Sequence, residues 1–423
     1  QFGSPETPTN LNHIVFGIVG SEQGWQSRRN YIESWWRPNV TRGYVFLDQN
    51  PNPSLLPWPE TSPPYRISSD LREFLNKSEV RAQRMVNGIM EVLREVEAEG
   101  GGGGFRWLVM GDDDTIFFTD NLVDMVSRFD HRKYYYLGAR SEFIYSNYWF
   151  SFDQAFGGGG IMLSYPLAKA MAKDMKNCLK RYAYLNSADN TTRACVTDLG
   201  TNLLPQQGNH QLDFRGDISG LLSSHPIAPL ISLHHFDFVD PIFPTMDRFE
   251  STRHLMSAAS ADQSRMLQQT ICYHRGFRWS LSVSWGYLAQ IYETILPRSH
   301  LHTPIETFQP WLETPGPPHY MFNTRLRSAE SCLAPHLFYL EALKKVPGGH
   351  EIQTTYARST ARGVSPCRSE EGRPAEFVRV IQVFSPATKR YETDRCECCD
   401  IIRVGGDKVQ VKIRRCLTGE VIA

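Results

Sequence analysis

The sequence has no excess of charge of either sign. Lys and Arg together number 45, and Asp and Glu also number 45, in a chain of 423 residues. Proteins that bind nucleic acids usually carry a basic excess that neutralises phosphates, so the composition gives no support to that class. A concentrated field at one cleft is compatible with the same total.

Long apolar runs are also lacking. No stretch approaches the roughly 20 residues that a membrane-spanning helix needs, and the start at Gln1 has no signal-peptide pattern. The missing initiator methionine suggests a processed or truncated chain. Any membrane attachment is therefore expected through an N-terminal anchor that this chain does not contain.

The nine cysteines lack the paired spacing of a zinc site, because Cys396, Cys398 and Cys399 are too crowded for the usual ligand loop. Disulfides formed in a secretory lumen fit better, with one thiol left over. Three N-x-S/T sequons, which begin at Asn39, Asn76 and Asn190, point the same way, although each could arise by chance.

No internal repeat is evident, and the chain divides by its hydrophobic pattern. After a polar leader at 1–12, short apolar strands alternate with helical patterns over 13–200, which predicts an α/β fold with a mainly parallel sheet and covering helices. The pattern loosens from about 250. We expect an α/β domain at 13–300 and a C-terminal extension at 301–423, whose strictly alternating strands predict a small antiparallel β module with most of the cysteines.

An acidic triplet ends a buried-type strand in "RWLVMGDDDTIFF" (106–118). In an open α/β sheet, ligands bind beyond the carboxyl ends of the strands, and Asp112, Asp113 and Asp114 lie at such an end. Carboxylates favour Mg²⁺ or Mn²⁺, which in turn bind diphosphate oxygens. The alternative is an acidic cluster that stabilises the N-terminus of a following helix.

Two further segments bear on this choice. Four glycines, Gly157 to Gly160, precede another strand, where they allow either close approach of a ligand or a tight turn. Adjacent histidines, His234 and His235, follow in "SLHHFDFVDP". A site with Asp and His ligands suits Mn²⁺ better than one built from carboxylates alone.

The ordered set of motifs resembles the Fringe-like glycosyltransferases, and in particular their plant branch, the DUF604 family. The set comprises "WLVMGDDDTIFF", "FGGGGIMLSYPLAKAM", "SHPIAPLISLHHFD", "CYHRGFRWSLSVSWGY", "MFNTR" and the C-terminal "CCDIIRV…VQVKIRRC". The resemblance extends from about residue 13 to 416. A single acidic triplet is a weak signal, but the order of all six segments is specific.

The resemblance implies a GT-A fold of glycosyltransferase family 31 and transfer of a sugar from a UDP-sugar, with inversion, to a glycan or glycoconjugate hydroxyl. A β-1,3-type linkage, a divalent ion (Mn²⁺ or Mg²⁺) and a type II membrane protein of the Golgi lumen are the associated expectations. The identity of the sugar is not readable from any residue.

The resemblance also assigns residues. Asp112 and Asp113 would contact the nucleotide, and Asp114 would bind the ion with His234, Asp112 being a further ligand. His235 is the next choice for the histidine ligand, and His225 and His210 are weaker ones. Gly158, Gly159 and Gly160 would lie along the donor and acceptor cleft.

The expected catalytic base is where this chain departs from its relatives, which place an acidic pair before the helix after the glycines. In "NSADNTTRAC" the base position falls on Asn190, which cannot accept a proton usefully, and Asp189 precedes it. Either Asp189 is the base through a one-residue shift, or the enzyme is altered here, or Asp213 or Asp217 supplies the carboxylate. A role of Asp189 as a helix N-cap is the structural alternative.

Three functions therefore remain open at this point. The first is a metal-dependent inverting glycosyltransferase with Asp189 or Asn190 at the base position. The second is a catalytically silent protein that binds sugar or nucleotide and keeps the same fold. The third, a metal-dependent hydrolase, lacks a second acidic cluster with two-metal spacing.

Two local hypotheses concern a pair of cysteines and a group of aromatic residues. Cys178 and Cys195 flank the 183–192 loop, and a disulfide between them would fix that loop beside the cleft. Four aromatic residues could stack on an acceptor sugar or simply pack: Tyr145, Tyr148, Trp149 and Phe150.

Overall fold

The computed structural model describes residues 7–100, 104–359, 362–368, 373–390, 392–393 and 395–422. These residues form two compact units. Unit 1 comprises the described residues up to Asp213 together with Ile231–Asp237 and Glu313–Met321. Unit 2 comprises Phe214–Leu230, Phe238–Leu312 and the described residues from Phe322 onward.

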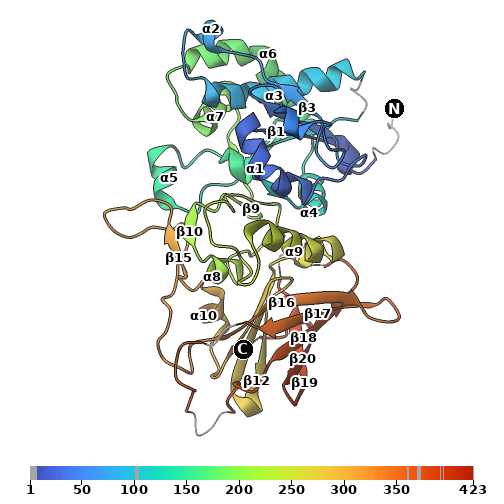
Figure 1. The fold of residues 1–423 in the computed structure, drawn as a ribbon, viewed down its shortest axis with the longest axis vertical. Coiled ribbons are helices and arrows are strands. Elements are labelled where there is room, and N and C mark those ends of the chain that lie inside the picture. The colour runs from blue at the N-terminus through green and yellow to red at the C-terminus, as the bar shows by residue number, and fades with distance from the viewer. Residues whose placement is uncertain are drawn as a thin grey trace. The chain divides into compact units, whose positions relative to one another are not determined.

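Unit 1 is built on a seven-stranded sheet (Figure 1). In spatial order its strands are β3 (Tyr65–Ile67), β2 (Gly43–Leu47), β1 (Ile14–Val19), β4 (Trp107–Asp112), β7 (Ile161–Ser164), β6 (Tyr136–Gly138) and β8 (Leu203–Pro205). Only β7 runs antiparallel to its neighbours among these described strands. The prediction of a mainly parallel sheet in an α/β fold is therefore confirmed.

Helices cover this sheet, and α3 is central among them because it contacts α6, α7 and β1. Its buried residues include Val86, Ile89, Leu93 and Val96, spaced three or four apart, so one stripe of the helix faces the core. The helices of unit 1 are α1 (Glu22–Glu33), α2 (Arg72–Leu75), α3 (Arg81–Ala98), α4 (Thr119–Val126), α5 (Ile144–Trp149), α6 (Tyr165–Arg181) and α7 (Ala188–Asp198).

A small three-stranded sheet lies beside the end of β4. It joins β5 (Ile116–Phe117), β11 (Ser232–Leu233) and β9 (Asn209–His210). Because β11 pairs with β5, it brings the chain after Leu233 next to the segment that follows β4. Residues more than a hundred positions apart in the sequence thus meet beside the carboxyl end of β4.

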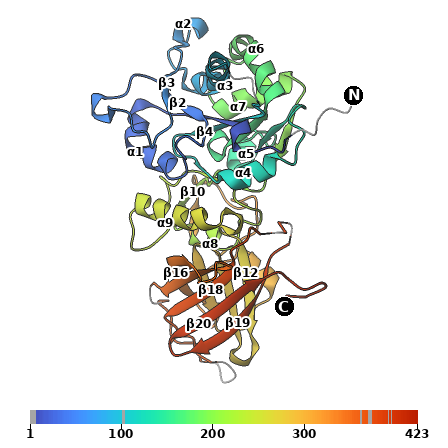
Figure 2. The same ribbon diagram turned by 90° about the vertical axis from the view of Figure 1, so that its right-hand side faces the viewer.

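Unit 2 contains an eight-stranded sheet, whose C-terminal strands are seen side by side in Figure 2. In spatial order its strands are β12 (Gln269–His274), β13 (Trp279–Ser284), β14 (Leu288–Tyr292), β16 (His336–Lys345), β17 (Glu351–Arg358), β18 (Val380–Pro386), β20 (Lys408–Arg414) and β19 (Cys398–Gly405). The expected antiparallel pairing is correct except at one place: β18 and β20 pair in parallel.

The remaining elements of unit 2 are short or peripheral to that sheet. They are β10 (Phe214–Gly216), α8 (Ser219–Leu222), α9 (Arg248–Ala261), α10 (Arg298–His302) and β15 (Phe308–Pro310). No helix in the described part of the chain is both long enough and apolar enough to pass through a bilayer.

The division into units differs from the expected boundary at residue 300. Strands β12 to β14 belong to the same sheet as the C-terminal strands because β14 pairs with β16. A disulfide between Cys272 and Cys399 fastens this sheet further. At the N-terminus, residues 1–6 of the expected leader lie outside the described residues, and a 3₁₀ helix (Leu11–His13) begins within its remaining part.

The cysteines pair as the sequence suggested in outline. Cys178 joins Cys195, which confirms the predicted disulfide between α6 and α7. The other pairs lie in unit 2, and Cys396 is the free thiol. Of the glycine run at 100–104, residues 101–103 lie outside the described residues.

Candidate functional site

The acidic triplet follows the central strand of unit 1. β4 lies between β1 and β7, and its residues from Trp107 to Gly111 are all buried. The hydroxyl of buried Thr115 then holds the turn: it accepts a hydrogen bond from the Asp112 amide at 2.8 Å and donates one to the Gly158 carbonyl at 2.8 Å. The end of β4 and the glycine segment are thereby fastened together.

Asp113 and Asp114 point into the protein, where Arg28 of α1 lies between them. Its guanidinium is 3.0 Å from Asp113 Oδ1 and 3.6 Å from Asp114 Oδ2. The same side chain reaches Asp237 at 2.6 Å. Asp113 also fills the space beside Gly20 and Gly24, where a Cβ would meet its carboxylate. Asp113 therefore braces the turn between β1 and α1.

His234 completes the arrangement. Its Nε2 lies 3.0 Å from Asp114 Oδ1 and 3.7 Å from Asp112 Oδ2. Burial alone would lower the pKa of His234, but its interactions with the two carboxylates outweigh that effect and raise the pKa to about 9. Burial raises the pKa of Asp112 to about 7, because His234 only partly offsets it. Burial would raise the pKa of Asp114 as well, but His234 and Arg28 together outweigh it and hold this pKa well below its ordinary value.

The donor atoms fit a divalent cation. One oxygen of Asp112, one of Asp114 and one nitrogen of His234 all lie within 4.8 Å of one another. The 3.0 Å between Asp114 and His234 is close to the ~3 Å that separates adjacent ligands on an octahedral ion with bonds of about 2.1 Å. Asp114 Oδ1 is buried, and its contact with His234 does not have the geometry of a hydrogen bond. A mixed carboxylate and imidazole set of this kind suits Mn²⁺.

Charge balance supports the same conclusion. Four carboxylates, those of Asp112, Asp113, Asp114 and Asp237, form their ion pairs among the described residues with two cationic groups, Arg28 and protonated His234. Buried carboxylates in excess of cations are costly unless a further positive charge joins them. A divalent ion would supply that charge.

The glycine segment gives room to the histidine. Gly157–Gly159 forms a 3₁₀ turn, and a Cβ on Gly158 would lie 2.0 Å from the His234 ring. Gly160 has φ of 88°, a conformation that favours glycine. The amide of Gly159 donates to Gln211 at 2.7 Å, and its carbonyl accepts from Asn209 at 2.8 Å. The polar groups of Gly159 are thus used within the protein.

Asp189 lies beside Asp112. It sits in the first turn of α7, accepts a hydrogen bond from the Gly157 amide at 2.8 Å, and lines a small cavity that Asp112 also lines. Burial raises the pKa of Asp189 to about 6. The N-cap interpretation of Asp189 is wrong, because Ser187 caps α7. The backbone N–H of Asn190 donates to the Ser187 hydroxyl at 3.3 Å, and Asn190 does not line this cavity.

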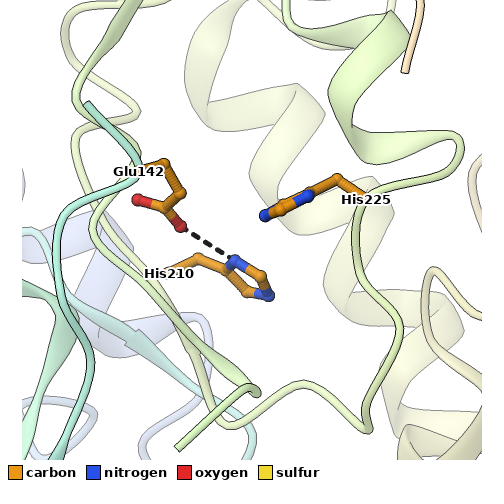
Figure 3. A group of neighbouring side chains, drawn as sticks. All are labelled: Glu142, His210 and His225. Atoms are coloured by element: carbon orange, nitrogen blue, oxygen red, sulfur yellow. Dashed lines mark hydrogen bonds and ion pairs between the residues drawn. The ribbon is translucent and has the colours of Figure 1, made fainter. Parts of the chain in front are cut away.

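The other candidates have structural partners. Nδ1 of His235 is 3.0 Å from Asp213, which also binds two serine hydroxyls. His210 pairs with Glu142 at 2.9 Å, as Figure 3 shows. His225, drawn in the same figure, belongs to unit 2, as does Asp217, and neither is assigned to the site at the end of β4.

The four aromatic residues that could stack on an acceptor sugar differ in their surroundings. Tyr145 packs against Trp149, whereas Tyr148 is 70% exposed, and Phe150 is the C-cap residue that follows α5. Sequence reasoning did not assign Arg28, Asp237 or Thr115 to the site. Asp237 lies in the same "HHFD" segment as His234, which was the available signal, whereas no local pattern marks Arg28.

The comparisons with known proteins agree with this arrangement. Residues 9–214, which carry the triplet, the glycine segment and α7, match the family model described as Fringe-like, a domain of the glycosyltransferase family 31 type. This match suggests a glycosyltransferase. Residues 146–399, more than half of the chain, match the model described as a protein of unknown function, DUF604.

The chain therefore belongs to the DUF604 family, and the resemblance to both families is confirmed. No curated protein sequence is similar enough to count as a match.

Proposed function

We propose that this protein is a metal-dependent, inverting glycosyltransferase of the GT-A fold that uses a UDP-sugar. The observation that carries the proposal is the meeting of Asp112, Asp114 and His234 at the end of the central strand, in a domain of the Fringe-like type. A glycan or glycoconjugate hydroxyl is the proposed acceptor. The four disulfides favour a secretory lumen, for which the Golgi is our proposal.

Asp112, Asp114 and His234 would hold the cation, which in such enzymes neutralises the diphosphate of the departing nucleotide. The chain prepares the site through packing: Gly158 makes room for the imidazole, and Arg28 fixes the carboxylates of Asp113 and Asp114. Asp112, with its side chain 25% exposed, is the member of the triplet that reaches solvent. It is therefore the carboxylate best placed to meet a nucleotide.

Asp189 is the proposed catalytic base. Inversion in one displacement requires a group that takes the proton of the acceptor hydroxyl as the bond to the sugar forms. A carboxylate with a pKa of about 6 is largely ionised at neutral pH, yet basic enough to accept that proton. The Gly157 amide holds one of its oxygens, and this orients the carboxylate.

The competing function is a silent protein that keeps the same fold, and Asn190 is the residue that motivates it. The position of Asp189 beside Asp112 favours the enzyme, since a carboxylate is present where Asn190 does not reach. The two functions predict different assay results: the enzyme transfers the sugar or hydrolyses the donor, and the silent protein does neither.

A donor screen separates them. UDP-sugars are assayed for hydrolysis and transfer with and without Mn²⁺, in the natural protein and in Asp189→Asn and Asn190→Asp. We expect activity in the natural protein, with a rate that falls below about pH 6, and a loss of about a hundredfold or more in Asp189→Asn. Activity found only in Asn190→Asp would support the silent protein.

A further inference from the structure

Unit 2 contains a cavity of about 330 Å³ whose lining is basic. Arg325, Arg327 and Arg362 contribute to it, and no Asp or Glu is found among the described residues that line it. Its volume is at the lower end of the range of small-molecule sites. Neither Arg325 nor Arg327 forms an ion pair with a described carboxylate.

A hydrogen-bond chain orients the cavity's donors. Arg325 Nη2 donates to the Tyr292 hydroxyl at 2.7 Å, and this hydroxyl in turn donates to Gln290 Oε1 at 3.2 Å. Tyr292 is fully buried in β14, so its hydroxyl has little freedom to turn toward other partners. Since the Gln290 oxygen is the acceptor, the donor of this side chain is its amide nitrogen.

Gln290 is only 5% exposed, and it lines the cavity. Arg362 Nε, which belongs to another lining residue, is buried without a hydrogen bond to any described residue. A buried donor without an acceptor is costly unless a ligand or water supplies the acceptor. The cavity therefore selects for groups rich in acceptors.

The charge of the cavity is not neutralised as a whole. Arg362 lies 3.0 Å from Glu293 and also pairs with Glu376, so these two glutamates balance the charge of Arg362. Arg325 and Arg327 keep theirs, and the field of Arg325 lowers the pKa of His300 in addition to the lowering caused by burial. The cavity consequently favours a negative ligand.

From these contacts we infer that the cavity binds an acidic sugar, a monosaccharide unit that carries a carboxylate. The carboxylate matches the positive charges of Arg325 and Arg327. Nε and Nη2 of Arg325 already donate to the Thr303 carbonyl and the Tyr292 hydroxyl, so Nη1 is the nitrogen through which Arg325 would meet the ligand. The hydroxyls match Gln290 and the Ser and Thr side chains of the lining. This inference does not depend on the proposed transferase activity, because every residue that carries it lies in unit 2.

Calorimetry with the full chain in metal-free buffer tests the inference, with glucuronate, glucose and inorganic phosphate as probes. We expect glucuronate to bind, glucose to bind at least about tenfold more weakly, and phosphate to bind more weakly than glucuronate. Equal binding of glucose would overturn recognition by the arginines, and equal or tighter binding of phosphate would overturn the sugar part.

Variants that keep the fold then locate the ligand. Gln290→Glu retains the acceptor for Tyr292 but adds a negative charge, and should weaken glucuronate binding at least about tenfold. Arg327→Gln changes an exposed residue and should also weaken it, whereas Arg403→Gln, with the same change of charge elsewhere in unit 2, should not. Unchanged binding in the first two variants, equal losses in all three, or no binding of glucuronate at all would refute the site.

Discussion

Each unit of this protein brings two carboxylates and one histidine together, but the two groups are built for different ends. Asp112, Asp114 and His234 gather in unit 1, and Glu293, His336 and Glu376 gather in unit 2. By composition, either group could hold a metal ion. The two groups differ in the charged residues that surround them.

In unit 2 the charges are already matched. Arg362 pairs with both glutamates, and Arg358 adds a second cation at 3.3 Å from Glu376. Burial lowers the pKa of His336, so that this histidine is mainly neutral at pH 7. In unit 1 the carboxylates outnumber the cations instead. Composition alone therefore does not identify a cation site, whereas the local excess of charge does.

The first prediction concerns activity. Asp114→Asn should lower ion-dependent donor turnover by about a hundredfold or more, because the site loses its most buried carboxylate. Glu293→Gln should leave turnover per folded molecule within about twofold of the natural value. Steady-state kinetics with Mn²⁺ measure both, and a comparable loss in the two variants would remove the distinction between the groups.

The second prediction concerns stability. Glu293→Gln should lower the free energy of unfolding by about 3 kcal/mol, because it leaves Arg362 buried with one partner fewer. Glu351→Gln is the matched control: it breaks a surface pair with Lys412 and should cost less than about 1 kcal/mol. Denaturant titration decides, and equal costs would mean that the buried network contributes no more than a surface pair.

The third prediction concerns the space beside His234. Gly158→Ala places a methyl group where the imidazole lies and should destabilise the protein by about 2 kcal/mol and weaken Mn²⁺ binding. Gly276→Ala, in unit 2, meets no atom closer than 3.6 Å and should change neither quantity. Normal Mn²⁺ affinity in Gly158→Ala would show that the imidazole is not held against this glycine.

The fourth prediction is the smallest and concerns protons. His234 has a raised pKa of about 9 and must lose its proton to bind an ion, so Mn²⁺ affinity should rise up to about tenfold per pH unit as pH rises toward that value. His234→Asn should flatten this dependence, whereas His336→Asn should not. Calorimetry in buffers of different ionisation enthalpy counts the released protons, and a count of zero would contradict the role of His234.

Much of unit 1 could be predicted from the sequence because its signals are local. Apolar runs identify β1 and β4, and the spacing of buried residues identifies α3. The arrangement of unit 2 was less accessible. Alternation indicates strands but not their direction, so the parallel pair β18 and β20 is not readable from it.

Contacts over long sequence distances set a similar limit at the site. The motif order placed His234 with the triplet, although the two are separated by more than a hundred residues. Arg28 carries no motif, and its role follows only from the packing of α1 beside β4. Ser187 caps α7, two residues before Asp189, and hydrophobic patterns do not resolve a difference of this size.

Direct titration of the full chain with Mn²⁺, followed by electron paramagnetic resonance, tests the central claim most closely. We expect Mn²⁺ to bind at the triplet site, and we expect Asp114→Asn to abolish this binding and Glu293→Gln to preserve it. Undiminished Mn²⁺ binding in Asp114→Asn, or its loss in Glu293→Gln, would contradict the assignment.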